Sequence, residues 1–151
     1  MISLMYHYNY TEFKNDTRQL AQRCRPFHAD TIVGIARGGL MLSQALGYAL
    51  NIRNIQSVRA ESYDGTYQRD ILNLHVNCDL STSERVLIVD DIVDSGATLQ
   101  LVLETLTARH PNILFKSATL FYKPTASLQS DFTLHEATQW ITFFWERDFN
   151  S

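Results

Sequence analysis

Short apolar runs alternate with helical patterns along most of this chain, which is typical of a parallel sheet flanked by helices. The clearest run, Val86 to Val89, is continuous and aliphatic, as expected of a strand buried on both faces. Further strands are predicted at Thr31 to Ala36, Ile55 to Arg59 and Ser117 to Tyr122. We therefore expect an α/β fold with a twisted, mainly parallel sheet.

Three helical patterns accompany these runs. Thr11 is expected to cap the first helix, which Pro26 closes. The second covers Leu40 to Leu50, a buried helix with Ser43 and Gln44 on its outer side. The third begins after residue 98 and runs to about Arg109, where a basic residue suits the negative end of a helix.

Polar chemistry begins abruptly after the central apolar run, with Asp90 and Asp91. A loop of small residues then opens the third helix: Asp94, Ser95, Gly96, Ala97 and Thr98. The backbone N–H groups and partial positive charge of a helix start can surround an anion. Two adjacent carboxylates would repel that anion unless they bound sugar hydroxyls or a divalent cation. A sugar phosphate with Mg²⁺ meets all of these demands.

A second candidate anion site lies at the turn Arg37-Gly38-Gly39, between the first core strand and the second helix. The same helix-dipole argument applies, because the turn again leads from a strand into a helix. Taken alone, however, the glycines are equally consistent with a tight turn that binds nothing.

Length and composition favour one domain spanning residues 1–151, with 45% hydrophobic residues to build a core. The formal net charge of −3 indicates no extended basic surface, which disfavours nonspecific binding of nucleic acid. We expect Cys24 and Cys78, the two cysteines of the chain, to be reduced thiols and not a disulfide. Without a secretory signal or an apolar run of the ~20 residues that span a bilayer, we expect a cytoplasmic protein with no transmembrane segment.

The stretch from Arg85 to Leu99 resembles the phosphoribosyl pyrophosphate signature of the type I phosphoribosyltransferases. The shared pattern is a hydrophobic strand, two acids, two aliphatics, Asp, Ser or Thr, Gly and Thr. Ala97 departs from it mildly, because relatives often carry Gly there. Response-regulator receiver domains also contain Val-Leu-Ile-Val-Asp-Asp, but near their start and without the Asp-Ser-Gly-Ala-Thr continuation.

The resemblance implies a role for each matching residue. Asp90 and Asp91 would hold ribose hydroxyls and Mg²⁺, with Asp91 as the metal residue, and Asp94 would act as general base or stabilise the purine N7 proton. The 5-phosphate would lie in the loop Ser95, Gly96, Ala97 and Thr98. The pyrophosphate would be bound by Arg37, Gly38 and Arg69, in a loop that often carries a non-proline cis peptide in this family.

The same resemblance implies a hood and a purine pocket. Ala60 to Asp70 lacks apolar periodicity and would form a hood carrying Ser62 and Tyr63, with a return strand from Ile71 to Val76. Together with the C-terminal segment, this hood would exclude water from the activated sugar. The purine-binding residues would be Lys123, which reaches the oxygen at C6, and Trp140 and Ile141, which supply stacking and a backbone carbonyl.

The chain is most similar to the small bacterial xanthine-guanine enzymes of that family. The implied reaction transfers a phosphoribosyl group from phosphoribosyl pyrophosphate to a purine base, with Mg²⁺ as cofactor and no nucleic acid. The alternative is a regulator of the same fold that binds nucleotides or nucleic acid without purine transfer. Among bases, hypoxanthine alone or a pyrimidine stays open. A surplus of aromatic residues points to a homodimer or homotetramer.

Overall fold

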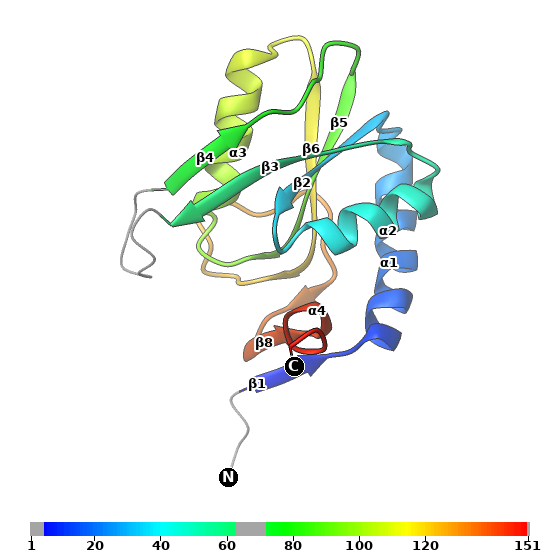
Figure 1. Cartoon of the computed structure of the whole chain (residues 1–151), viewed down its shortest axis with the longest axis vertical. Coiled ribbons are helices and arrows are strands. Elements are labelled where there is room, and N and C mark those ends of the chain that lie inside the picture. Colours follow the sequence, from blue (N-terminus) through cyan, green and yellow to red (C-terminus); the bar gives the residue numbers. More distant parts are fainter. Residues whose placement is uncertain (1–4, 63–71, 151) are drawn as a thin grey trace.

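The computed structural model describes residues 5–62 and 72–150, which form a six-stranded sheet with helices on both faces (Figure 1). The strand order is β4-β3-β2-β5-β6-β7, and every neighbouring pair is parallel except β3 and β4. The strands are β2 Thr31–Ala36, β3 Asn54–Ser62, β4 Leu72–Val76, β5 Arg85–Val93, β6 Leu114–Tyr122 and β7 His135–Glu136. The predicted α/β fold with a mainly parallel sheet is confirmed.

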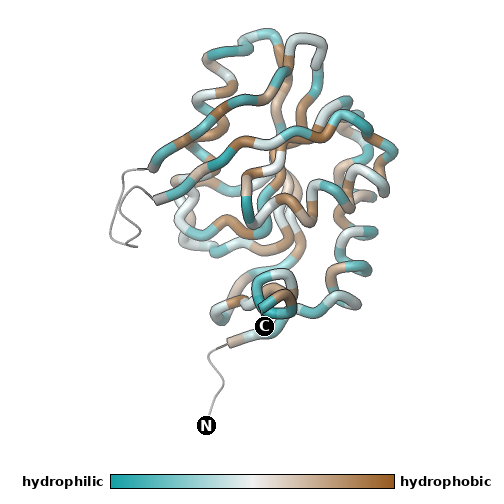
Figure 2. Tube along the Cα trace, viewed as in Figure 1, coloured by the Kyte–Doolittle hydropathy of each residue, from teal (hydrophilic) through white to brown (hydrophobic). Residues whose placement is uncertain are grey.

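Side chains of the central strands alternate between two hydrophobic cores. Leu87 and Val89 of β5 pack on the side of α1 (Tyr10–Cys24) and α2 (Leu40–Leu50). Val86 and Ile88 pack on the side of α3 (Ala97–Arg109). All four side chains are fully buried, so the run is buried on both faces as predicted. Figure 2 shows hydrophobic residues recurring along these central strands.

The first helix begins earlier than the sequence suggested, because Asn9 rather than Thr11 caps it. The Asn9 side chain accepts a hydrogen bond from the Glu12 backbone N–H at 2.9 Å, and the Glu12 carboxylate accepts one from Asn9 N–H at 2.9 Å. This reciprocal capping box satisfies two N–H groups and outweighs a single threonine cap. The helix ends at Cys24, followed by a short 3-10 turn, η1 (Arg25–Phe27), which contains Pro26.

The expectation for Ser43 was wrong. Ser43 is completely buried in α2, and its hydroxyl donates to the carbonyl of Gly39 at 2.7 Å. A Cβ on Gly34 of β2 would lie 2.4 Å from this hydroxyl oxygen. The Ser43 hydroxyl therefore has its hydrogen-bond partner within its own helix. This allows the buried side chain to pack against Gly34, which has no side chain of its own.

The strand β5 extends past the apolar run, so Asp90 and Asp91 lie inside it. On one side β5 pairs with β2 only as far as Val89, whereas its pairing with β6 continues to Val93. From Asp90 onward β5 is no longer paired with β2. The two carboxylates therefore lie at the carboxyl end of the parallel sheet, where ligands commonly bind.

A second, two-stranded sheet stands apart from the main one at the end of the molecule where the C-terminus lies (Figure 1). It pairs β1 (Met5–Tyr8) in parallel with β8 (Trp140–Phe143), which is followed by α4 (Phe144–Arg147). Neither strand was predicted as such. In the described residues, no helix is both long and apolar enough to cross a bilayer.

Candidate active site

Three cavities adjoin one another around the end of β5. The first, about 80 Å³, is lined by the loop that precedes α3, and the second, about 420 Å³, is lined by Lys123 and β8. They share Ile92 and Asp94. The third, about 720 Å³, lies beside Arg37 and shares Asp91 and Glu146 with the second. The three cavities are called the loop cavity, the β8 cavity and the Arg37 cavity below.

The loop cavity has the form expected of an anion site. It is lined by Asp94, Ser95, Gly96 and Thr98, among other residues. Gly96 has φ 92° and precedes the first residue of α3. A Cβ on it would lie 2.8 Å from the backbone N of Leu128. Glycine is therefore required both by the left-handed backbone and by the close approach of another chain segment. At the start of α3 the Ala97 N–H donates to Ser95 Oγ at 3.2 Å, and a helix start has further N–H groups without partners in the helix that can bind an anion.

The turn at Arg37 packs directly against the acidic pair. A Cβ on Gly38 would lie 2.4 Å from Asp91 Oδ2, and one on Gly39 would lie 2.4 Å from the carbonyl oxygen of Val89. Both glycines are thus needed for space. The turn contains a cis peptide, located between Ala36 and Arg37.

The two carboxylates after Val89 are half-buried and close together. Asp90 Oδ1 accepts a hydrogen bond from the Asp91 backbone N–H at 2.9 Å. Burial, together with the neighbouring Asp91 charge, holds the pKa of Asp90 well above its ordinary value. Burial also raises the pKa of Asp91 to about 6, and the Glu146 carboxylate contributes in the same direction. A cation placed here would relieve this repulsion.

Lys123 and Asp94 are brought together at the β8 cavity. Lys123 Nζ lies 2.8 Å from Asp94 Oδ1. The backbone of Lys123 is held at the end of β6, where its N–H donates to Val93 and its carbonyl accepts from Gln129 and Ala126. The sequence placed each residue in a site but did not indicate that they pair.

The remaining wall of the β8 cavity comes from the C-terminal segment. The indole of Trp140 is 67% exposed and lines the cavity, so its face is open to a planar ligand. The Ile141 side chain is buried. Both predicted purine residues thus lie beside Lys123, together with Ala137, Thr138, Gln139 and Phe143, which the sequence did not single out.

Three predicted residues cannot be placed with the others. Tyr63 and Arg69 lie outside the described residues. Ser62 ends β3, and the structure describes only its backbone. The proposed hood loop and the third pyrophosphate residue therefore stay predictions.

Glu146 is a site residue that sequence reasoning missed. It lies in α4, lines both the β8 cavity and the Arg37 cavity, and accepts a hydrogen bond from the Phe143 backbone N–H at 3.0 Å. The sequence around it, Trp145-Glu146-Arg147, carries no motif. The only indication in the sequence was an acidic residue that directly follows the aromatic segment near the C-terminus.

Comparisons with known proteins agree with this geometry. A family model described as the phosphoribosyl transferase domain matches residues 9–150. A xanthine-guanine phosphoribosyltransferase of Idiomarina loihiensis is 33% identical over 144 residues, covering 91% of this chain and 84% of that protein.

Solved structures agree as well. A xanthine-guanine-hypoxanthine phosphoribosyltransferase of Helicobacter pylori superposes with a TM-score of 0.85 at 31% identity, over 95% of this chain and 93% of that one. A purine phosphoribosyltransferase of Pyrococcus horikoshii gives a TM-score of 0.84 at 28% identity, over 96% of both chains.

Proposed function

The chain belongs to the phosphoribosyl transferase family, and we propose that it is a purine salvage enzyme. It transfers the phosphoribosyl group of 5-phosphoribosyl-1-pyrophosphate to a nitrogen of a 6-oxopurine and releases pyrophosphate. Guanine and xanthine are the favoured bases, with hypoxanthine the third, because relatives carry these names. The observation that carries the proposal is the set of three adjoining cavities, one for each part of such a substrate pair.

Each cavity has a matching ligand. The loop cavity receives the 5-phosphate on the N–H groups and hydroxyls of Ser95 to Thr98. The Arg37 cavity receives the pyrophosphate, where the guanidinium supplies positive charge. The β8 cavity receives the base, stacked on Trp140. Asp91 and Glu146 stand between the last two, beside the bond that breaks.

The Lys123 and Asp94 pair accounts for selection of 6-oxopurines. The oxygen at C6 accepts a hydrogen bond from Lys123, and the N7 proton is donated to Asp94, so one base edge replaces the ion pair. Adenine has an amino group at C6, which cannot accept from an ammonium. A pyrimidine lacks the second ring that carries N7, so it could not contact Lys123 and Asp94 in the same way.

The residues present fit a shared Mg²⁺. This ion commonly binds one or two protein carboxylates together with substrate phosphate oxygens and water. Asp90 and Asp91 supply such a pair, with Asp91 as the principal metal residue; burial raises the pKa of both carboxyls, and a bound cation would favour their charged forms. Among residues 5–62 and 72–150 no group of three metal-binding side chains occurs, so the proposal assigns the remaining ligands to substrate oxygens and water. When bound, Mg²⁺ offsets the charge of the leaving pyrophosphate.

Pyrophosphate release is the direct test. The purified chain is incubated with phosphoribosyl pyrophosphate and Mg²⁺, and separate reactions contain guanine, xanthine, hypoxanthine, adenine, orotate or uracil. We expect turnover with the three 6-oxopurines and none with the others. Binding of phosphoribosyl pyrophosphate without turnover on any base would overturn the proposal and favour a regulator.

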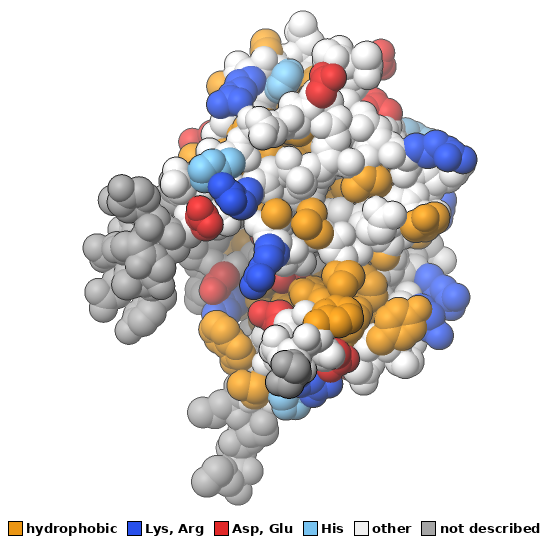
Figure 3. Space-filling view, in the orientation of Figure 1, with side chains coloured by type: hydrophobic (Ala, Val, Ile, Leu, Met, Phe, Trp, Pro, Cys, Tyr) orange, Lys and Arg blue, Asp and Glu red, His pale blue; other side chains and the backbone are white. Residues whose placement is uncertain are grey.

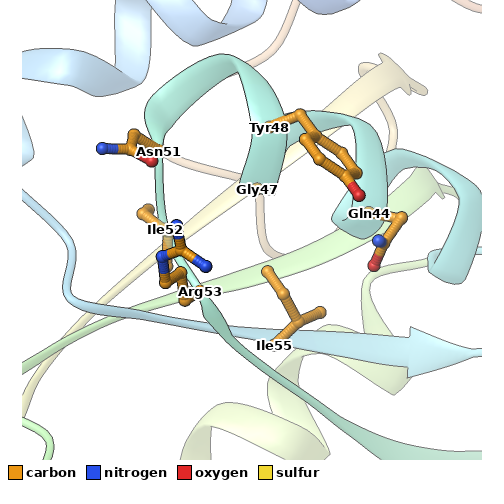
Figure 4. A pocket seen from close by; sticks show the side chains of 7 residues that line it. All are labelled: Gln44, Gly47, Tyr48, Asn51, Ile52, Arg53 and Ile55. Atoms are coloured by element: carbon orange, nitrogen blue, oxygen red, sulfur yellow. The ribbon is translucent and has the colours of Figure 1, made fainter.

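We also propose that a second copy of this chain covers the outer face of α2, giving a homodimer or a homotetramer built from such pairs. Tyr48 is 82% exposed on this helix, and hydrophobic side chains gather over α2 and α4 (Figure 3). Figure 4 shows Tyr48 and Gln44 beside a cavity of about 480 Å³ at the end of α2. Gln44 also lines the Arg37 cavity, so the exposed face connects the two. A two-fold axis on one helix makes a self-complementary interface.

Sedimentation velocity tests this assembly. We expect the parent chain to sediment as a dimer or tetramer and Tyr48→Glu to shift it to a smaller species. The control is Leu114→Glu, which places the same charge at an exposed position on another surface, the first residue of β6. A monomeric parent chain at micromolar concentration would refute the interface.

A further inference from the structure

One buried carboxylate oxygen connects three elements around the β8 cavity. The hydroxyl of Tyr8, on β1, donates to Asp16 Oδ2 at 2.6 Å. His135, on β7, places Nε2 3.0 Å from the same oxygen. Asp16 itself lies on α1 and is only 8% exposed. Helix α1 packs against α2 and β6, so this oxygen belongs to the main body of the protein.

The two partners of Asp16 lie at the two ends of the segment that walls the β8 cavity. His135 and Glu136 immediately precede residues 137–139, which line the cavity. Tyr8 lies opposite Phe143, the last residue of β8, in the β1–β8 pairing. The Tyr8 ring also contacts Phe143 edge-on at 5.6 Å. One oxygen therefore holds both ends of the base-binding wall.

A second cavity lies on the far side of this wall, so its middle residues have less packing than its ends. This second cavity, of about 410 Å³, shares Thr138, Gln139 and Ile141 with the β8 cavity. The segment therefore separates two cavities along residues 138, 139 and 141, while the side chains of Ile141 and Phe143 are buried in the hydrophobic core. A partition of this kind keeps its position through its attachments at either end.

Protonation states support the arrangement. Burial and the neighbouring Asp16 carboxylate raise the pKa of Tyr8, so its hydroxyl keeps its proton and remains a donor. The carboxylates of Glu12 and Glu136 line the same cavity, and Tyr6 donates to Glu12. Asp16 Oδ2 accepts the hydrogen bond of Tyr8 and also accepts one from His135 in the tautomer that carries its proton on Nε2, and the other acidic side chains of this cavity are Glu12 and Glu136.

We propose that Tyr8, Asp16 and His135 are positioning residues for the purine base: through Asp16 they hold Trp140 and Ile141 at the distance from Lys123 that a bound base requires. This inference rests on the proposed function. None of the three touches phosphoribosyl pyrophosphate in that proposal, so their loss affects one substrate and not the other.

The test is steady-state kinetics of Tyr8→Phe, which removes the hydroxyl and keeps the ring. We expect the KM for guanine to rise about 5- to 10-fold, as the loss of one ordinary hydrogen bond can produce. The KM for phosphoribosyl pyrophosphate should stay within about twofold. Tyr10→Phe is the matched control, because it removes the same group from a side chain that is 58% exposed. It should change neither KM.

His135 supplies an independent test and a rescue. His135→Ala should raise the KM for guanine, and His135→Gln should restore part of it, since its amide can donate to Asp16. Because both partners use one oxygen, Tyr8→Phe combined with His135→Ala should raise the KM by a factor different from the product of the single effects. Multiplicative effects would show that the two act separately.

The outcomes separate the possible failures. If the parent chain turns over no purine, the proposed function fails. If the parent is active and Tyr8→Phe leaves the guanine KM unchanged, the positioning role fails. A purely structural role would reduce the folded fraction, which lowers apparent kcat and leaves both KM values as they were.

Discussion

Lys123 Nζ lies 2.8 Å from Asp94 Oδ1, so the residue proposed to recognise the base and the residue proposed to hold its N7 proton are direct neighbours. Their side chains are 37% and 64% exposed, and an ion pair so open to solvent contributes little to stability. The pair is therefore free to exchange its mutual contact for the edge of a base. This arrangement allows the two roles to be tested separately.

Asp94→Asn should reduce kcat by about 10²- to 10⁴-fold, because an amide cannot accept the proton that a carboxylate accepts. The dissociation constant of phosphoribosyl pyrophosphate should remain nearly unchanged, as measured by calorimetry. Asp148→Asn is the control, since Asp148 forms a comparable exposed ion pair with Arg147. Loss of phosphoribosyl pyrophosphate binding with normal turnover would refute the role given to Asp94.

Lys123→Met should lower kcat/KM for guanine by about 10-fold or more, the effect of removing a charged hydrogen-bond donor from a base. The same change at Lys116, an exposed residue whose ammonium lies over the rings of Phe27 and Phe132, removes one charge without touching the cavity. Equal losses in the two variants would mean that net charge, and not contact with the base, explains the effect.

Asp91→Asn should stabilise the protein at neutral pH in the absence of Mg²⁺. The pKa of Asp91 is raised from 3.8 to about 6 in the folded state, so folding favours its protonated form. The resulting cost is absent below the unfolded pKa of 3.8 and is fully present above about pH 6. The stabilisation by Asn should therefore be on the order of 1–3 kcal/mol at pH 8 and vanish near pH 3.5.

Urea unfolding at the two pH values measures this difference. Added Mg²⁺ should stabilise the parent chain at pH 8 and have a smaller effect on Asp91→Asn, because the variant has lost a carboxylate of the site. A variant that is destabilised equally at both pH values would show that Asp91 supports the fold through contacts and not through its charge.

Gly38→Ala should raise the KM for phosphoribosyl pyrophosphate by about 10- to 100-fold, since displacements near 1 Å at a site have effects of that size. The added Cβ would lie 2.4 Å from Asp91 Oδ2, so either the turn or the carboxylate must move. The KM for the base should change less, because Gly38 does not line the β8 cavity. An unchanged KM for phosphoribosyl pyrophosphate would contradict the placement of pyrophosphate at this turn.

Much of the fold and of the site was determined by local sequence. The aliphatic run at Val86 to Val89 specifies a strand that is buried on both faces, because all four side chains are apolar and can pack in the core on either side of the sheet. The loop from Asp94 to Thr98 specifies a helix start with free N–H groups, and the glycine at 96 adopts the φ that other residues avoid. Such features depend only on neighbouring residues, so they can be predicted without knowing the rest of the fold.

The tertiary structure alone decided how the base-binding wall is held. Residues 5–8 pair with 140–143 from opposite ends of the chain, and such short strands carry too few residues to show a period. Asp16 looks like one more polar residue of an amphipathic helix until folding brings Tyr8 and His135 to it. Glu146, likewise, becomes a site residue only when α4 reaches Asp91. These contacts arise from packing between distant segments, and a sequence pattern reports only on near neighbours.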